Sequence, residues 1–288
     1  MEIKKIAILG QGSMGSSIAQ HAATCGYDVI LWGRNGEKVA AAVAKIGAAY
    51  DKQVGKGKME ADAAEAAKGH ITGTSNFDDI ADADLVIEAI SEDPDLKKDY
   101  FNKMVATCKP DAILATNTSS ISITEIASAV DCPERVIGMH FFNPVPLMKL
   151  VEIINGEKTA DATYEAVKQF CDEGLKKISV KVKDAPGFIV NRVLFAYFLE
   201  CIHIYEDGIA TKEDIDNAIK YGLNHPVPPF QMMDMGGLDT FPHVCESLQT
   251  LESKGAAERF ECPESMKALH AAGKFGRKSG EGWYVYDK

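Results

Sequence analysis

The chain has 288 residues, of which 46% are hydrophobic, so it is long enough to bury a sizeable core and to form two domains. Its formal net charge of -11 argues against nucleic acid as a partner, because a polyanionic backbone demands a basic face. The 7 cysteines and 7 histidines are scattered without metal-ligand spacing, and we find neither a signal-sequence pattern nor a run of about 18 apolar residues. These features predict a globular, cytoplasmic protein with reduced thiols, no metal site and no membrane span.

The chain opens with a short apolar strand, a glycine-rich turn and an alanine-rich helix. The turn follows the pattern Gly-x-Gly-x-x-Gly and consists of Gly10, Gln11, Gly12, Ser13, Met14 and Gly15. Its glycines permit, in order, a tight turn, close approach of a pyrophosphate to the backbone, and close packing of helix on strand. A glycine-rich turn without a ligand is the alternative. The flanking strand and helix favour a dinucleotide-binding turn.

The end of the second expected strand, 27–32, is where a dinucleotide fold usually carries an acid that binds the adenosine ribose. This chain has Gly33 and Arg34 there. A guanidinium binds a 2′-phosphate, whereas a carboxylate repels it, so we expect NADP(H) to be favoured. NAD(H) is possible too, because one charged hydrogen bond gives only about ten- to a hundredfold discrimination. In the alternative, Arg34 is a solvated loop cation, or stacks on adenine, and selects neither cofactor.

Alanine-rich sequence from Glu37 to Gly69 is interrupted by two glycines and predicts a helical hairpin. Lys52 and Lys56 lie one turn apart on a shared face of its first helix. They are candidates for binding an anionic ligand. A solvated helix surface is the alternative explanation of these charges.

Two further apolar strands, 84–90 and 112–117, continue the alternation of strands and helices and predict a doubly wound, Rossmann-like sheet. Glu92 follows the first of these strands, and Asn117 ends the second. Ligands bind at the carboxyl ends of such strands, so Asn117 and Ser119 are expected to reach the nicotinamide or the substrate. A helix cap is the competing role for Ser119.

The segment His-Phe-Phe-Asn-Pro at 140–144 carries the main catalytic signal. The expected strand 135–139 delivers His140 to the same edge of the sheet, and the expected strand 150–154 brings Glu152 beside it. An imidazole that a carboxylate orients is a suitable proton carrier for hydride chemistry between an alcohol and a ketone.

The character of the sequence changes at Pro186, which breaks the preceding element. Residues 1–185 are interpreted as a dinucleotide-binding domain with the helical hairpin as an insertion, and residues 186–288 as an all-α domain. The helix that follows, through about Tyr205, is too apolar to face solvent all round, yet polar residues such as Asn191 argue against a membrane span. Residues 283–286 are expected to form a strand at the end of the chain.

Taken together, these motifs resemble the 3-hydroxyacyl-CoA dehydrogenase family over essentially the whole chain, and most closely its bacterial branch that acts on 3-hydroxybutyryl-CoA. The matching stretches are 10–15, 88–90, 117–120, 140–144, 148–152, 186–192, 213–216 and 276–280. The chain departs from the family pattern at Gly33-Arg34 and at Pro228, where the family generally has glycine.

The resemblance implies roles for individual residues. It implies that His140 and Glu152 are the catalytic pair, and that Ser119 and Asn191 contact the substrate oxygen. It further implies that Glu92, Lys97 and Asn117 line the cofactor site, and that Lys52 and Lys56 meet the CoA moiety of an acyl-CoA substrate. A homodimer formed largely through the helical domain is implied as well.

The expected reaction is therefore reversible oxidoreduction of short-chain (S)-3-hydroxyacyl-CoA and 3-oxoacyl-CoA, in butyrate-type fermentation or fatty acid metabolism. One alternative is a β-hydroxyacid dehydrogenase acting on free acids, but those enzymes usually rely on a lysine base. Another is a nucleotide-binding protein without catalysis. The presence of a full set of candidate catalytic residues argues against it; these are Ser119, His140, Glu152 and Asn191.

Overall fold

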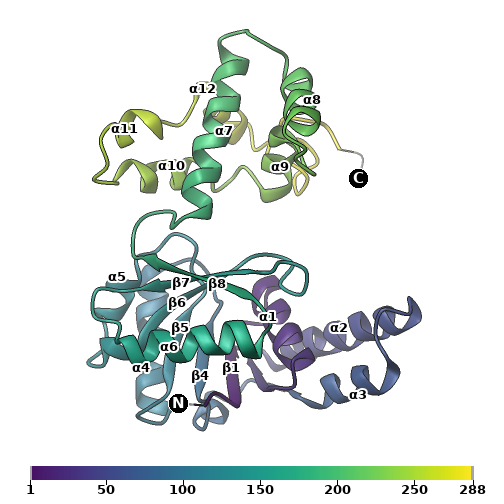
Figure 1. Cartoon of the computed structure of the whole chain (residues 1–288), viewed down its shortest axis with the longest axis vertical. Helices are drawn as coiled ribbons and strands as arrows, with labels where there is room; N and C mark the ends of the chain where they lie inside the picture. Colours follow the sequence, from purple (N-terminus) through teal and green to yellow (C-terminus); the bar gives the residue numbers. More distant parts are fainter. Residues whose placement is uncertain (1, 287–288) are drawn as a thin grey trace. The chain divides into compact units, whose positions relative to one another are not determined.

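The computed structural model describes residues 2–286 and divides into two compact units, residues 1–184 and 185–288. The boundary expected from the sequence, between residues 185 and 186, lies one residue further along the chain. Each unit has its own hydrophobic core, one built around a sheet and the other built from helices. Figure 1 shows both units, coloured along the chain.

The first unit is an eight-stranded sheet in the order β3-β2-β1-β4-β5-β6-β7-β8. The strands are β1 (Lys5–Leu9), β2 (Asp28–Trp32), β3 (Ile71–Thr74), β4 (Leu85–Glu88), β5 (Ile113–Thr116), β6 (Val136–Phe141), β7 (Leu150–Asn155) and β8 (Ile178–Lys183). All neighbouring pairs are parallel except β6 and β7. Because the strand order reverses between β1 and β4, a ligand crevice is expected where the carboxyl ends of these strands meet.

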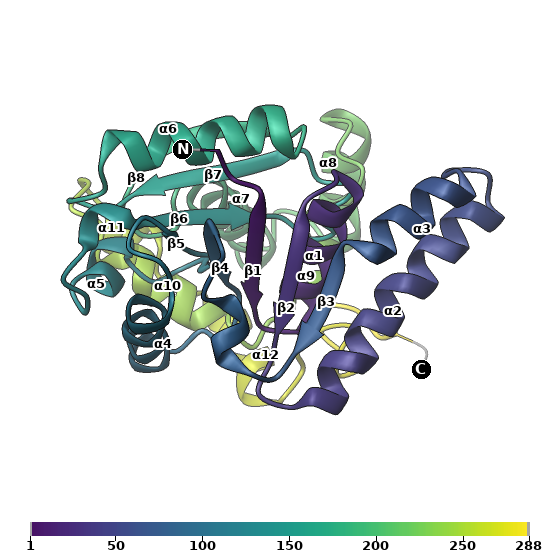
Figure 2. The ribbon, with the colours of Figure 1, turned by 90° about the horizontal axis from the view of Figure 1, so that it is seen from below.

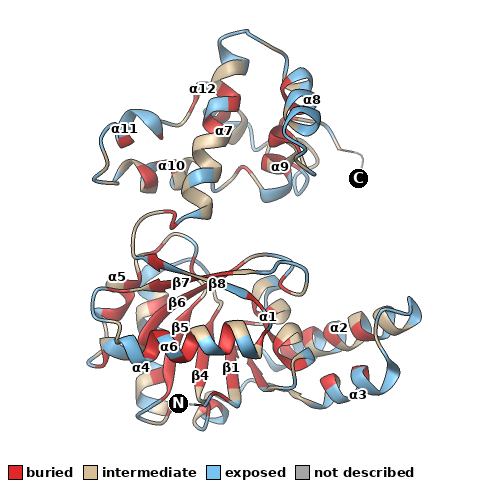
Figure 3. Cartoon of the chain, in the orientation of Figure 1, coloured by how far each residue is buried: buried red, intermediate tan, exposed pale blue. Residues whose placement is uncertain are grey.

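Helices cover the sheet and extend one edge of it (Figures 1 and 2). They are α1 (Ser13–Thr24), α2 (Gly36–Gly55), α3 (Ala61–Gly69), α4 (Pro94–Thr107), α5 (Ile123–Ala127) and α6 (Asp161–Gln169), with short turns η1 (Phe77–Ile80), η2 (Pro133–Arg135) and the π-helical η3 (Phe170–Gly174). α1 and α6 share one core with the central strands β1, β4, β5, β6 and β7, which are almost wholly buried, whereas β3 and β8 at the two edges are more exposed (Figure 3). α2 and α3 form the expected helical pair, which projects beyond β3 (Figure 2).

Local sequence explains where several helices begin. The Asn35 side chain accepts the backbone N-H of Lys38 and caps α2, and Asp93 accepts that of Leu96 ahead of Pro94 in α4. In the second unit the Thr211 side chain caps α8 in the same way, as its sequence indicates.

The second unit contains α7 (Val190–Glu206), α8 (Lys212–Gly222), α9 (Pro229–Gly236), α10 (Phe241–Gln249), α11 (Ala256–Arg259) and α12 (Glu264–Ala271). A Rossmann-like domain followed by a helical domain is thus confirmed. Pro228 stands directly before α9 with φ of -75°, and its carbonyl accepts the N-H of Met232, so proline suits this position. Within residues 2–286, no helix has both the length and the apolarity needed to cross a membrane.

The expected C-terminal strand is wrong. Residues 283–286 make only an isolated bridge, between Glu281 and Val285. The backbone N-H groups of Trp283 and Tyr284 donate instead to the buried Asp234 carboxylate, at 2.9 Å each. A side-chain acceptor therefore takes the donors that a strand ladder would have used.

Candidate functional site

The glycine-rich turn joins β1 to α1 and has the shape that a dinucleotide requires. Gly10 has a φ of +116°, and a Cβ there would lie 2.4 Å from the Ala89 carbonyl oxygen. A Cβ on Gly15 would lie 1.8 Å from the Gly10 carbonyl oxygen, so only glycine allows α1 to pack this closely. A Cβ on Gly12 would meet nothing within 4 Å, which leaves open space where a pyrophosphate approaches. The turn thus fits a dinucleotide at the N-terminus of α1.

The other side chains of the turn differ in exposure. Ser13 is exposed at the first position of α1, while Met14 is partly buried against the core. The Gln11 side chain reaches the end of β2, where its Oε1 atom lies 2.2 Å from the place a Cβ on Gly33 would take. Arg34 is exposed directly after Gly33. Where other dinucleotide folds hold a ribose-binding acid, this chain therefore presents a glutamine amide and a guanidinium.

His140 and Glu152 are brought together by the one antiparallel pair in the sheet. They are register partners on β6 and β7, and the His140 Nδ1 atom lies 2.7 Å from Glu152 Oε2. His140 is 6% exposed and Glu152 is 0% exposed. A hydrogen bond is stronger in a buried place, so the carboxylate fixes the orientation of the ring.

The loop after β5 is fixed from two sides. Asn117 Oδ1 accepts the backbone N-H of Phe141 at 2.9 Å, next to His140. Glu92 Oε1 accepts the backbone N-H groups of Ser119 and Ser120, at 2.9 and 3.2 Å. Ser119 is exposed, and its Oγ atom is 3.5 Å from the same carboxylate oxygen. The structure thus places Glu92, Asn117, Ser119 and His140 at one edge of the sheet.

Lys97 also belongs to this edge, but its side chain is only 1% exposed. Its Nζ atom lies 2.7 Å from Glu88 Oε1 and 3.2 Å from Glu92 Oε2. Burial acts to raise the pKa of Glu92, but the Lys97 ammonium and the loop donors outweigh it, so this pKa lies below its ordinary value. Glu92 is therefore held as a carboxylate.

The remaining candidates lie elsewhere. Lys52, in α2, and Lys56, its C-terminal cap, are both exposed near the tip of the α2–α3 pair. Asn191 is the second residue of α7, in the other unit, and is partly exposed. A cavity of about 680 Å³ runs between α1 and α2 from the glycine-rich turn. Its lining includes Gln11, Gly12, Ser13, Lys38, Lys45 and Asn143.

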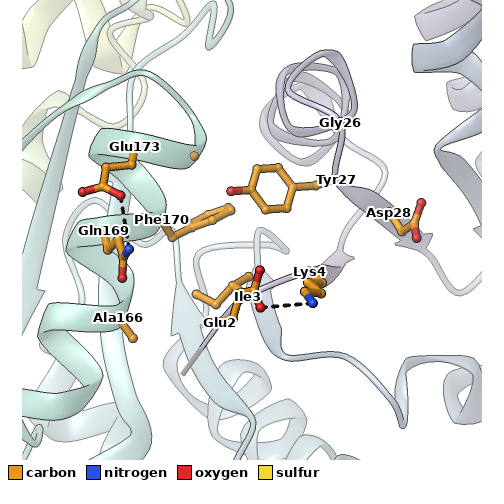
Figure 4. Close-up of a pocket in the computed structure, with 11 residues that line it drawn as sticks. Glu2, Ile3, Lys4, Gly26, Tyr27, Asp28, Ala166, Gln169, Phe170 and Glu173 are labelled. Atoms are coloured by element: carbon orange, nitrogen blue, oxygen red, sulfur yellow. Dashed lines mark hydrogen bonds and ion pairs between the residues drawn. The ribbon is translucent and has the colours of Figure 1, made fainter.

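A second cavity of about 680 Å³ lies at the opposite edge of the sheet, where β1 and β2 begin (Figure 4). Tyr27 and Phe170 meet edge to face on one side of it, with ring centroids 5.0 Å apart. Glu2, Asp28 and Glu173 contribute carboxylates, and Lys4 pairs with Glu2 at 3.0 Å. This acidic lining disfavours the phosphates of a dinucleotide or of CoA.

Some residues that shape the site were given no role on the basis of the sequence. Glu88, at the end of β4, carried a detectable signal, because a charged residue inside an otherwise apolar strand needs a buried partner. Lys177 carried no such signal, although its Nζ atom donates to the carbonyl oxygens of Val145 and Met148 in the loop after the His140 segment. Among the described residues, no group of three or more His, Cys, Asp or Glu side chains is arranged to hold a metal ion.

Comparison with known proteins defines the class. Residues 5–185 match the family model described as 3-hydroxyacyl-CoA dehydrogenase, NAD binding domain, and residues 187–286 match that of the 3-hydroxyacyl-CoA dehydrogenase C-terminal domain. The chain therefore belongs to the 3-hydroxyacyl-CoA dehydrogenase family, as its motifs indicated.

Particular relatives narrow the comparison. The chain is 43% identical to the 3-hydroxybutyryl-CoA dehydrogenase of Clostridioides difficile over 285 residues, which covers 99% of this chain and 100% of that protein. It is 42% identical to the enzyme of the same name from Bradyrhizobium diazoefficiens, over 99% of this chain and 96% of that protein. The crystal structure of (S)-3-hydroxybutyryl-CoA dehydrogenase from Ralstonia eutropha matches with a TM-score of 0.95 and 39% identity, covering 100% of both chains.

Proposed function

We propose that the protein catalyses the reversible oxidoreduction of short-chain (S)-3-hydroxyacyl-CoA and 3-oxoacyl-CoA, with acetoacetyl-CoA as the oxidised substrate. The observation that carries this proposal is the buried His140–Glu152 pair, 2.7 Å apart, on the sheet that also carries the dinucleotide turn. The names of the relatives from C. difficile and R. eutropha support the same substrate class.

The proposed roles follow from the geometry of the pair. A nicotinamide cofactor, when bound, supplies or accepts the hydride. With Nδ1 of His140 directed at Glu152, the ring exchanges a proton with the substrate oxygen through Nε2. In reduction the imidazolium gives this proton to the nascent alkoxide, and in oxidation the neutral ring takes it from the hydroxyl. Ser119 and Asn191 hold the reacting oxygen by hydrogen bonds.

For the cofactor, we propose a preference for NADP(H) over NAD(H). The exposed Arg34 offers a 2′-phosphate a charged partner, and the Gln11 amide lies against Gly33 at the place of the usual acid. Arg34→Ala is expected to lower kcat/KM for NADPH about ten- to a hundredfold and to leave that for NADH nearly unchanged. A wild-type enzyme that prefers NADH by more than tenfold contradicts the preference.

For the CoA moiety, we propose that Lys52 and Lys56 bind its phosphates. Lys52→Glu should then raise the KM for acetoacetyl-CoA steeply, and affect the truncated N-acetylcysteamine thioester much less. Lys183→Glu, another exposed lysine of the same unit, serves as the control. Equal effects on both thioesters would show that Lys52 is an ordinary surface charge.

We further propose a cytoplasmic homodimer formed through the helical unit, in which α7 exposes Val193 by 66%. Analytical ultracentrifugation of wild type and Val193→Glu tests this assembly, because a charge in an apolar interface should weaken it.

Absorbance of NADPH or NADH at 340 nm, with acetoacetyl-CoA as substrate, tests the proposed reaction directly. Turnover of acetoacetyl-CoA but not of free acetoacetate is expected. Turnover of free acetoacetate alone would indicate a β-hydroxyacid dehydrogenase. If neither substrate is turned over, the protein would be interpreted as a nucleotide-binding protein without catalysis. A series of acyl chain lengths then separates a role in butyrate-type fermentation from one in general fatty acid metabolism.

A further inference from the structure

A chain of charged and hydroxyl groups, buried at its Glu88–Lys97 end, lies beneath the loop that carries Ser119. Its first member is Glu88, the last residue of β4, which is 0% exposed. Glu88 Oε2 accepts the hydroxyl of Thr116, its register partner on β5, at 2.7 Å. Glu88 Oε1 accepts the backbone N-H of Ile90 at 2.7 Å and the Lys97 ammonium at 2.7 Å. Both carboxylate oxygens of Glu88 are therefore satisfied by fixed donors.

Lys97 carries the chain from the sheet to the loop. It stands on α4, and its ammonium bridges Glu88 and the more exposed Glu92. A buried ammonium is strongly disfavoured unless it is paired, and two carboxylates within 3.2 Å provide that pairing. The Glu92 carboxylate, which shares this ammonium with Glu88, needs hydrogen-bond donors of its own as well.

Glu92 Oε1 receives those donors from the loop. The Thr118 hydroxyl donates at 2.5 Å and the Ser120 hydroxyl at 3.0 Å. The N-H groups of Ser119 and Ser120 donate at 2.9 and 3.2 Å. One carboxylate oxygen thus collects the donors of three consecutive residues, an arrangement that fixes backbone as well as side chains.

We propose that Glu88 and Lys97 are positioning residues, which hold Glu92 in place so that Glu92 fixes the 118–120 loop and with it the Ser119 hydroxyl. This inference rests on the proposed function, in which Ser119 binds the reacting oxygen. It assigns Lys97 a role different from direct contact with the cofactor, because its ammonium is buried against two carboxylates.

Lys97→Met tests the inference, with Lys98→Met as the matched control. Lys98 is the next residue of α4, and its ammonium pairs with Glu125 at 2.7 Å on the surface. Misplacement of a reacting group by about 1 Å can reduce rate about a hundredfold, so kcat of Lys97→Met should fall about ten- to a hundredfold. Its dissociation constants for NADPH and NADH, from fluorescence titration, should change less than threefold, which is our threshold for indirect action. Lys97→Arg, which keeps the charge, should recover much of the lost rate.

A rise in the cofactor dissociation constant in parallel with the loss of kcat would overturn the inference, because it would show that Lys97 binds the cofactor. Loss of thermal stability with unchanged kcat would also overturn it. Should Lys97→Met fail to fold, Glu92→Gln gives the same test while leaving the Glu88–Lys97 pair intact. Its kcat should fall, and an unchanged kcat would count against the inference.

Two further measurements separate this inference from the proposed function. Hydrogen exchange of a peptide spanning 117–122 should quicken in Lys97→Met and not in Lys98→Met, because the N-H groups of Ser119 and Ser120 lose their fixed acceptor. This readout needs no substrate, so it holds even if acetoacetyl-CoA is not turned over. In active protein, Lys97→Met and Ser120→Ala should be non-additive in kcat, since both act through Glu92. Unchanged exchange, or strict additivity, would refute the coupling.

Discussion

Both units bury acidic side chains, but the two clusters are built differently. In the first unit the ammonium of Lys97 lies between Glu88 and Glu92, and the cluster ends on the loop of Ser119. In the second unit Asp216 and Asp234 are 3% and 1% exposed and accept hydrogen bonds from backbone N-H and tyrosine hydroxyl groups.

The donors of the second cluster come largely from the C-terminal segment. Asp234 accepts Trp283 N-H, Tyr284 N-H and the Tyr286 hydroxyl, and Asp216 accepts the Tyr284 hydroxyl. A Cβ on Gly282 would lie 2.1 Å from Asp234 Oδ1, so the segment packs against this carboxylate. We infer that the cluster of the first unit serves the rate of the reaction, whereas the hydrogen bonds of the second cluster serve the stability of the fold.

The largest effect is expected at His140. His140→Ala should lower kcat by about 10²- to 10⁴-fold, the usual contribution of a general acid-base group, with little change in cofactor affinity. His70→Ala is the matched control, because His70 Nδ1 lies 2.7 Å from Asp28 Oδ1 in the same kind of pair, but on the surface. A His140→Ala enzyme that retains more than half of the wild-type rate would remove His140 from its assigned role.

Asp234→Ala should show the opposite behaviour and affect stability. It leaves two backbone N-H groups and one hydroxyl without their acceptor, and each buried donor so abandoned costs about 1 to 3 kcal/mol. The free energy of unfolding in urea should therefore fall by about 3 kcal/mol or more, while kcat per folded molecule stays near wild type.

Glu213→Ala provides the comparison for Asp234→Ala. Its carboxylate is 58% exposed and lies 3.6 Å from Lys212, so its loss should change stability by less than about 1 kcal/mol. A stable Asp234→Ala protein with lost activity would reverse the division of roles between the two clusters.

The difference between the clusters also shows what sequence can reveal. The dinucleotide turn and the His140–Glu152 pair were predictable, because each depends on local spacing within a strand and its turn. The strand β8 was not predicted, although its residues alternate between apolar and polar. The wrong C-terminal strand has a physical cause, because Asp234 lies 49 residues from Trp283 and no local pattern shows that contact.

The chain of groups from Glu88 to Ser120 was predictable in part. Lys97 lies 9 residues from Glu88 and reaches it from α4, and Thr116 lies 28 residues away and reaches it through the parallel pairing of β4 with β5. The sequence showed that Glu88 is charged within an apolar strand, but the partner depends on how α4 packs. Charged residues in buried strands therefore indicate that a network exists without identifying its members.

Lys177 differs from Lys97, although both are buried in the first unit, because Lys177 binds carbonyl oxygens rather than carboxylates. Burial lowers the pKa of Lys177, and its ammonium donates to Val145 O and, at 2.8 Å, to Met148 O. Lys177→Met should loosen the loop that follows the His140 segment, reducing kcat about tenfold and stability by about 1 to 3 kcal/mol together. Lys183→Met, on the exposed side of β8, should change neither. A change in stability alone would group Lys177 with the second cluster.

The smallest expected effect is a difference in how the two clusters respond to pH. The pKa of Glu92 is held below its ordinary 4.5, because Lys97 and the loop donors outweigh burial, so its contribution to stability is present above that pH and is lost on acidification. Burial raises the pKa of Asp216 above its ordinary 3.8, so its contribution is full below that pH and is lost as pH rises.

Replacing each carboxylate by the isosteric amide removes its titration. The free energy of unfolding in urea, measured from about pH 3.5 to about pH 7, then shows the contribution of that carboxylate. Relative to wild type, Asp216→Asn should gain stability as pH rises, because the amide stays neutral while the wild-type carboxyl must ionise in a buried place. Glu92→Gln should lose stability relative to wild type over the same range, because it lacks the charge that Lys97 and the loop stabilise. Slopes of the same sign would show that the ammonium of Lys97 does not distinguish the two clusters.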